Sequence, residues 1–166
     1  MNILLTLNFE AANKNEEAEF QVRDTARAVI FDDNHNIALM KVAQGSFHKL
    51  PGGGIDQGET PEQALVRECR EEAGVEITDI KKIGLIREIK KSRKKIQNSH
   101  CYVAYVVGAK TQPQLTESEK KSGFEVLWLK HDDAIQLIRK EGYSTLDGRY
   151  ISERELAILV AAKDSV

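Results

Sequence analysis

Residues 53–75 of the chain read GGIDQGETPEQALVRECREEAGV, a glycine-rich turn followed by a helix whose two ends are marked in the sequence. Thr60 and Gln63 have the spacing of a capping box, which begins a helix. Gly74 stands where a helix commonly ends in a left-handed residue. The pattern therefore predicts a helix over residues 61–73.

This helix carries three glutamates, Glu68, Glu71 and Glu72, at the spacing i, i+3, i+4, which places them on one face. Like charges at this spacing destabilise a helix by roughly a few tenths of a kcal/mol, and acids near its carboxyl end oppose the helix dipole. A hard divalent cation such as Mg²⁺ or Mn²⁺ offsets such repulsion, because it binds clustered carboxylate oxygens. The alternative is a solvated acidic face.

The apolar residues of the same helix, Leu65, Val66, Cys69 and Ala73, predict a buried stripe, with the glutamates on an opposed side that faces a cleft or solvent. Cys69 and Cys101 have no C-x-x-C spacing and no histidine at ligand spacing. We therefore expect both cysteines to be reduced packing residues, and neither a disulfide scaffold nor a structural zinc site.

The whole stretch resembles the Nudix box, the signature of hydrolases that act on a nucleoside diphosphate linked to another moiety. Cys69 is the one mild departure, since the pattern usually has Ile, Leu or Val there, and cysteine packs as a small hydrophobe. The residues that fill the fixed positions are Gly53, Glu59, Arg67, Glu68, Glu71, Glu72 and Gly74.

The resemblance implies that the three glutamates of the helix are catalytic and bind Mg²⁺ or Mn²⁺, with the carbonyl of Gly53 as a further candidate ligand. It also implies that Glu59 and Arg67 form an orienting pair. A guanidinium beside crowded carboxylates fixes their geometry and lowers their repulsion. An ordinary surface ion pair would make the same contact between Glu59 and Arg67.

Patterns on either side of the box predict the rest of the fold. Apolar runs bounded by turn residues indicate strands, and helical periodicity marks the later part of the chain. The expected strands are residues 25–31, 37–42, 83–89, 100–107 and 125–129, and the expected later helices are residues 132–141 and 152–163. This order indicates an α/β fold with a mixed sheet, and the resemblance implies the Nudix α/β/α sandwich.

The composition fits one globular domain over residues 1–166, of which residues 1–20 are compatible with a strand or a loose arm. The chain has 24 Lys+Arg against 26 Asp+Glu. This balance removes the global positive field that non-specific nucleic-acid or membrane-surface binding would use. The amino terminus has no basic leader, and no run approaches the roughly 18 apolar residues of a membrane span. We therefore expect a cytoplasmic protein with no membrane partner.

Hydrolysis of a diphosphate needs an activated water and neutralised phosphoryl oxygens. The sequence leaves the general base open. Glu71 or Glu72 in the box could serve, and Glu117 or Glu119 in the downstream loop could be the base or an extra metal ligand. For each of the last two, a plain surface acid is the alternative.

Substrate contacts are predicted in two places. The basic stretch 87–95 could hold the phosphates of a highly charged substrate, with Lys91, Arg93 and Lys94 as its candidates, or it could be a solvated hairpin whose lysines guard a sheet edge. Phe47 and His48 precede the glycines and are placed to contact a ligand.

The substrate class is inferred by elimination. The motifs that mark Nudix enzymes acting on NADH, ADP-ribose, diadenosine polyphosphates and coenzyme A are absent around the box. A MutT-type nucleoside triphosphate pyrophosphohydrolase remains, with a small nucleotide or polyphosphate as its partner. The alternatives are an inactive nucleotide- or partner-binding module, which is disfavoured because no box carboxylate is missing, and a hydrolase of other polyphosphorylated substrates or RNA 5′ ends. Nucleic acid is not the expected partner, because no accessory RNA domain is evident.

Overall fold

The computed structural model describes residues 2–141 and 145–163. Within them a mixed sheet of seven strands has the order β1-β5-β6-β2-β3-β4, with β7 paired to β3. The strands are β1 (Ile3–Leu7), β2 (Gln21–Phe31), β3 (Asn36–Val42), β4 (Phe47–Lys49), β5 (Glu76–Lys90), β6 (Lys95–Val107) and β7 (Phe124–Lys130). β1 runs parallel to β5 and β2 runs parallel to β6, whereas the remaining neighbours are antiparallel.

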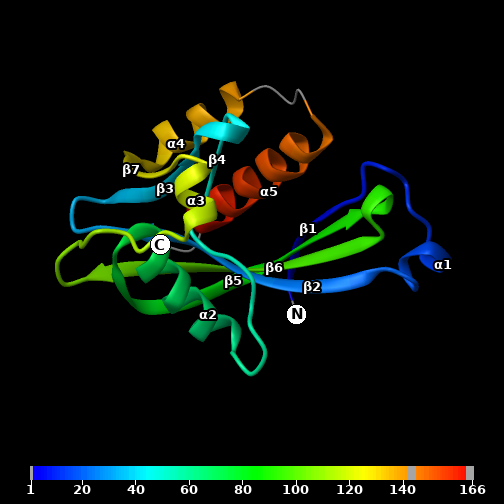
Figure 1. The fold of residues 1–166 in the computed structure, drawn as a ribbon, viewed down its shortest axis with the longest axis horizontal. Coiled ribbons are helices and arrows are strands. Elements are labelled where there is room, and N and C mark those ends of the chain that lie inside the picture. Colours follow the sequence, from blue (N-terminus) through cyan, green and yellow to red (C-terminus); the bar gives the residue numbers. More distant parts are fainter. Residues whose placement is uncertain (1, 142–144, 164–166) are drawn as a thin grey trace.

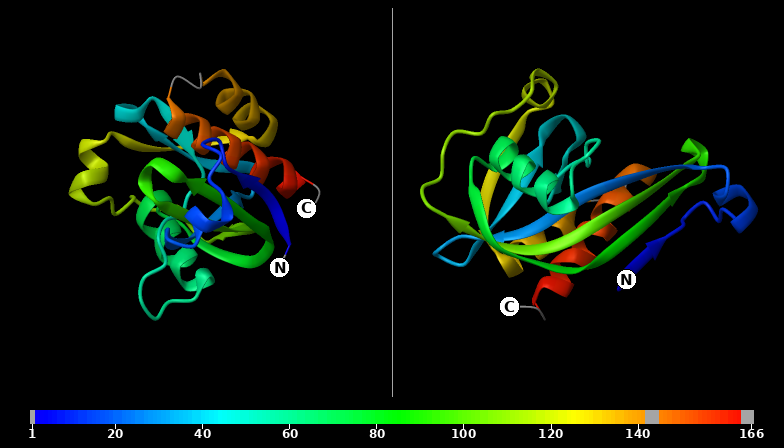
Figure 2. Two further views of the ribbon diagram at one scale, coloured as in Figure 1. Left: turned by 90° about the vertical axis from the view of Figure 1, so that its right-hand side faces the viewer. Right: turned by 90° about the horizontal axis from the view of Figure 1, so that it is seen from below.

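Helices cover both faces of the sheet. They are α1 (Lys14–Glu17), α2 (Pro61–Glu68), α3 (Glu117–Lys121), α4 (His131–Lys140) and α5 (Leu146–Lys163). In Figure 1 and in the left view of Figure 2, α2 lies below the sheet while α4 and α5 lie above it. The expected α/β/α sandwich with a mixed central sheet is therefore confirmed. None of the described helices is long and apolar enough to cross a membrane.

The alternation of side chains along β2 builds the two halves of the core. Ala26, Ala28 and Ile30 pack in the cluster that contains α2, and Val29 and Phe31 pack in the cluster that contains α4 and α5. All five are buried. Because successive residues of a strand point to opposite faces, a short apolar run can serve both layers at once.

The helix expected over residues 61–73 changes character part-way. Its first part, α2, begins with the predicted capping box, and Gly74 ends the helical segment at φ +65°. Between them, however, Cys69–Ala73 is a π-helical turn. The wider turn alters the face on which later residues lie. Glu72 is consequently buried, at 1% exposure, so its expected place on an open acidic face is wrong.

The buried side of α2 also differs from the expected stripe. Leu65, Cys69 and Ala73 are buried as predicted, but Val66 is only half-buried and Ala64 takes its place in the core. The two positions are two residues apart, about 200° around a helix, so the helix is rotated relative to the predicted stripe.

Two strands are longer than predicted, and together they form the long β5–β6 hairpin. Its turn is a single 3₁₀ segment, Lys91–Arg93, in place of a loose basic loop. Polar residues such as Glu88, Gln97 and Ser99 made these strands hard to detect, although all three are buried in the sheet. Along with β2, the hairpin continues beyond the helical layers toward α1, so that residues 1–20 contribute both a paired strand and a short helix (Figure 1).

Candidate active site

Glu68, the last residue of α2, lies directly against the glycine-rich loop. A Cβ built on Gly53 would be 2.3 Å from Glu68 Oε1, so only glycine admits the carboxylate at this distance. The loop itself is fixed by β2, because the Gly53 carbonyl accepts a hydrogen bond of 3.0 Å from the N–H of Ala26. The end of α2, the loop and β2 therefore meet at one point.

Arg67 joins most of the remaining acidic residues into one network. Its Nε and Nη2 atoms donate to the two oxygens of Glu59 at 2.8 and 2.9 Å, a bidentate contact. Its Nη1 donates to Glu68 at 2.8 Å and lies 3.4 Å from Glu71. The hydrogen bond from Arg67 is the main reason that the pKa of Glu59 falls to about 2. Arg67 also donates to the carbonyl of Gly54, so it ties the loop to the helix.

Glu72 is held differently, because it is buried beneath the same loop. Its Oε1 accepts from the ammonium of Lys49 at 2.7 Å, and its Oε2 accepts from the N–H of Gly52 at 2.9 Å. Lys49 ends β4, a strand that the sequence analysis did not predict. No residue pattern marks it, because the strand has only three residues, all of them half-buried, and it forms by pairing with β3.

Two carboxylates in this cluster are close enough to influence each other. Burial raises the pKa of Glu68, and the charge of Glu72 raises it further, while the hydrogen bond from Arg67 opposes both effects. A crowded, partly desolvated carboxylate of this kind is stabilised by additional positive charge. The site therefore favours a cation at the end of α2.

The donors present are of the type that hard divalent cations prefer, namely carboxylate and carbonyl oxygens. Within residues 2–141 and 145–163, however, no three His, Cys, Asp or Glu side chains are gathered closely enough to hold an ion. The reason is visible in the contacts, since Lys49 neutralises Glu72 and Arg67 bridges the other acids. The residues fit such a cation by chemistry, and Lys49 would have to leave Glu72 to admit one.

Helix α5 supports the loop from the other face of the sheet. The N–H of Leu50 donates to Glu155 at 3.2 Å, and the carbonyl of Leu50 accepts from Arg27 at 3.1 Å. Glu155 is fully buried and pairs with Arg154. The sequence analysis identified none of the three charged residues Arg27, Arg154 and Glu155, because hydrogen bonds that join β2, a loop and a distant helix leave no local pattern.

A cavity of about 460 Å³ adjoins Lys49 on the side of α5. Of the predicted substrate-contact residues, Phe47 and Arg93 line it. Its walls are rich in positive charge, contributed by Arg27, Lys49, Lys90, Arg93 and Arg154. A concave, cationic surface next to a carboxylate cluster is suited to an anionic ligand that also contacts a metal.

The structure does not bring the other predicted contact residues to this cavity. His48 is directed to the end of α4, where its ring Nδ1 and backbone N–H both contact Glu141. Lys91 forms an ion pair of 2.7 Å with Glu16, and Lys94 occupies the left-handed position of the hairpin turn at φ +47°.

The two downstream acids have local roles in α3. Glu119 completes a capping box with Thr116, and Glu117 forms an exposed ion pair of 2.8 Å with Lys120. Neither has a contact with the box glutamates, which leaves Glu71 and Glu72 as the candidates within the carboxylate cluster itself.

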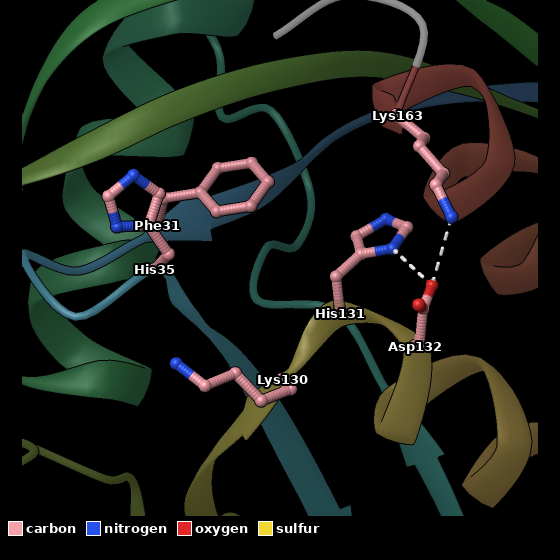
Figure 3. A pocket seen from close by; sticks show the side chains of 6 residues that line it. All are labelled: Phe31, His35, Lys130, His131, Asp132 and Lys163. Carbon is pink, nitrogen blue, oxygen red and sulfur yellow. Dashed lines mark hydrogen bonds and ion pairs between the residues drawn. The ribbon is translucent and has the colours of Figure 1, made fainter.

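A second cavity, of about 530 Å³, lies at the far end of the β2–β3 hairpin (Figure 3). Two histidines, His35 and His131, line it. Its one acid, Asp132, is already paired with Lys163 at 3.1 Å, and this contact lowers the pKa of Asp132. The ring of His131 stacks on Phe31 and contacts the carbonyl of Leu159. With a single acid among the residues that line it, this cavity has no carboxylate cluster like the one beside the first.

A family model described as the NUDIX domain matches residues 21–148. The chain belongs to the NUDIX family. The match includes the glycine loop, α2 and the π-helical turn, so the predicted resemblance is confirmed. A solved NUDIX hydrolase from Nitrosomonas europaea has a similar fold, with a TM-score of 0.61, 21% sequence identity, and coverage of 87% of this chain and 88% of that one.

Among curated NUDIX relatives, the 8-oxo-dGTP diphosphatase of Proteus vulgaris is 42% identical over 57 residues, which is 32% of this chain and 51% of that protein. The RNA pyrophosphohydrolase of Vibrio atlanticus (strain LGP32) is 38% identical over 60 residues, which is 36% of this chain and 35% of that protein. The matches thus span about half of the first relative's length and about a third of the second's.

Proposed function

We propose that this NUDIX protein is a divalent-metal-dependent hydrolase that cleaves nucleoside triphosphates into a nucleoside monophosphate and pyrophosphate. One observation carries the proposal: the Glu68 carboxylate, packed on Gly53 and bridged by Arg67, lies in a cluster that borders a cationic cavity through Lys49. The carboxylate cluster places hard oxygen donors together, and the cationic cavity provides a place for phosphates. The names of the two relatives, one acting on a nucleotide and one on RNA, agree with phosphoanhydride chemistry.

Three glutamates, Glu68, Glu71 and Glu72, would hold Mg²⁺ or Mn²⁺, together with the carbonyl of Gly53. When bound, such an ion neutralises phosphoryl oxygens and lowers the pKa of a coordinated water. Arg67 holds Glu68 and Glu71 in position through the contacts described above. Lys49, which lines the cavity and touches Glu72, is placed to contact a phosphoryl oxygen in exchange for that carboxylate.

Glu71 is the best candidate for the group that takes a proton from water. Its side chain is 39% exposed, and the one ion pair that it forms within the described part of the chain is the 3.4 Å contact with Arg67. Glu72, in contrast, is enclosed by Lys49 and Gly52. A base must reach a water, and the more open carboxylate meets this requirement.

The decisive experiment is a substrate panel with Mg²⁺, containing the common nucleoside triphosphates, 8-oxo-dGTP, dinucleotides, nucleotide sugars, inorganic polyphosphates and a 5′-triphosphorylated RNA. Products are separated by chromatography, and E68Q together with a chelator-treated sample serve as controls. Release of pyrophosphate from nucleotides, lost in both controls, is the expected result. Preferential hydrolysis of the RNA would show that the substrate is an RNA 5′ end. The absence of any metal-dependent product would refute the proposal that the protein is a hydrolase.

A further inference from the structure

Arg27 differs from the other cationic residues of the cavity in that no carboxylate is bound to it. It lies on β2, is 8% exposed, and lines the cavity. Its Nη1 donates to the carbonyls of Leu50 and Gly52 at 3.1 and 3.2 Å. Its Nε is buried and has no hydrogen-bond partner among the described residues.

Each of the other four cations that line this cavity is paired with a carboxylate. Lys49 pairs with Glu72, Arg93 with Asp147, and Lys90 and Arg154 both with Glu88. Within the described ranges, no ion pair or hydrogen bond joins Arg27 to a carboxylate, and its hydrogen bonds go to the two carbonyl oxygens.

A buried charge without a partner is costly for a folded protein. Burial and the nearby charge of Arg154 lower the pKa of Arg27, while the more distant charges of Glu155, Glu72 and Glu88 raise it, and a guanidinium remains protonated at neutral pH. The unpaired N–H and a positive charge with no directly bound carboxylate are therefore both persistent features of this cavity. An anion that enters the cavity would satisfy them together.

The position of Arg27 relates such an anion to the carboxylate cluster. Gly52 is shared between the two, because its carbonyl accepts from Arg27 while its N–H donates to Glu72. A ligand at Arg27 is thus separated from the metal-binding carboxylates by a single residue of the loop. One extended polyanion can contact both.

We propose that Arg27 binds a phosphoryl group of the substrate other than the one held at the glutamates, and so selects substrates that place an anionic group, rather than a neutral base or sugar, in this cavity. The inference rests on the proposed function for its substrate, and the guanidinium fork matches the geometry of phosphate oxygens. A nucleotide base does not have free access to the aromatic ring of Phe124, which also lines the cavity. The ammonium of Lys49 lies over that ring, 4.7 Å from its centre.

A site of this kind affects specificity more than a site made of exposed lysines would. An unpaired buried donor penalises any ligand that leaves it unsatisfied, whereas an exposed ammonium returns to water. Arg27 should therefore disfavour substrates that have no phosphate other than the one held at the glutamates. It should favour triphosphates.

The test uses the full chain without metal, so that binding is separated from hydrolysis. Inorganic pyrophosphate, a nucleoside 5′-monophosphate and the uncharged nucleoside are each titrated at constant ionic strength. The readouts are calorimetric affinity and the NMR signal of the Arg27 Nε–H, which is assigned by its loss in R27K. The variants are R27Q, which removes the charge, R27K, which keeps it without the fork, and K94Q, a matched loss of charge on the hairpin turn outside the cavity.

We expect the Nε–H signal to shift with pyrophosphate or the monophosphate and not with the nucleoside. R27Q should weaken phosphate binding by about 10-fold to 100-fold, R27K should restore part of it, and K94Q should stay within about twofold of the wild type. Whether R27Q weakens binding of pyrophosphate or of the monophosphate shows which end of the substrate occupies the cavity. A signal that moves only with the nucleoside, or phosphate affinity equal in R27Q and wild type, would overturn the inference.

The two proposals fail separately. The binding assay contains no metal, so the affinity for pyrophosphate is measured independently of hydrolysis. Phosphate binding that depends on Arg27 without any turnover in the substrate panel would refute the hydrolase alone. Turnover of triphosphates at equal rates in the wild type and R27Q, with an unresponsive Nε–H, would refute the role of Arg27 alone.

Discussion

The carboxylate of Glu68 lies where a side chain of residue 53 would begin, with Oε1 2.3 Å and Cδ 2.5 Å from the position of a Cβ on Gly53. The backbone of Gly53 is not in the left-handed region, so the absence of a side chain is required by the neighbour and not by the turn. The glycine at this position therefore determines where the carboxylate of Glu68, the proposed metal ligand, can lie.

G53A should consequently move the Glu68 carboxylate while leaving the fold intact. The end of a flexible side chain gives way at little cost, so we expect the free energy of unfolding to change by less than about 1.5 kcal/mol. We expect kcat to fall by at least about tenfold, because a displaced ligand weakens transition-state stabilisation. G148A, within α5, is the matched glycine control and should retain full activity. Wild-type kcat in G53A would show that the contact has no catalytic role.

E71Q and E72Q should both lower kcat by about 100-fold or more, since each removes a carboxylate charge from the proposed metal site. Their stabilities should differ. E72Q leaves the buried ammonium of Lys49 without its counter-charge and should destabilise the fold by about 1–3 kcal/mol, whereas the half-exposed Glu71 should tolerate the change. Urea denaturation together with metal-dependent turnover measures both effects. Equal stability of the two variants would contradict the buried contact.

Glu59 should contribute to stability in acid. Its pKa is lowered to about 2 by Arg67, below the ordinary value of 4.5, so its contribution is present above pH 4.5 and is lost as the pH falls toward 2. E59Q should flatten this part of the dependence of thermal stability on pH. E125Q, in an exposed and looser ion pair of 3.6 Å with Lys41, provides the comparison and should leave the profile nearly unchanged.

The basic hairpin should divide into one residue that contacts substrate and two that do not. R93S should raise KM for a triphosphate and reduce its salt dependence, with kcat largely unchanged, because Arg93 lines the cavity. K91S and K94S should have little effect, since neither side chain lines it. If K91S and K94S raise KM as much as R93S does, the hairpin acts through its overall charge and not through this cavity.

Cys69 should be inert toward thiol reagents in the folded protein. It is fully buried, and burial raises the pKa of its thiol well above its usual range. A chromogenic disulfide reagent should therefore react with Cys69 and with the equally buried Cys101 only after unfolding. C69V should keep wild-type turnover and lose less than about 1.5 kcal/mol of stability. Strong inactivation of C69V would place the thiol in the chemistry.

The sequence predicted those parts of the protein whose causes are local. Thr60 with Gln63 begins α2 and Gly74 ends the helical segment, because capping depends on residues a few positions apart. The resemblance to the Nudix box implied the contact between Glu59 and Arg67, which the structure contains. The π-helical turn was not predictable in this way, since nothing in the composition of Cys69–Ala73 distinguishes it from an α-helix.

The cavity could not be predicted from the sequence, because contacts between distant parts of the chain form it. Arg27 is surrounded by apolar residues in a strand and was indistinguishable from an ordinary sheet residue, while Arg154 and Glu155 fit a solvated face of an amphipathic helix. Their burial follows from the docking of α5 on β2 and β5. Residues joined through a sheet and a helix in this manner have no fixed spacing that a sequence pattern could capture.

The docking of α5 also has a consequence for biosynthesis. This helix, which is synthesised after the other described elements, covers one face of the sheet and supplies the Glu155 contact to Leu50 beside the glycine loop. At about 5–20 residues per second, several seconds separate synthesis of the box from synthesis of α5. During that interval the nascent chain exposes an apolar sheet face. We therefore expect the glycine loop to become ordered only after α5 has been synthesised and has docked.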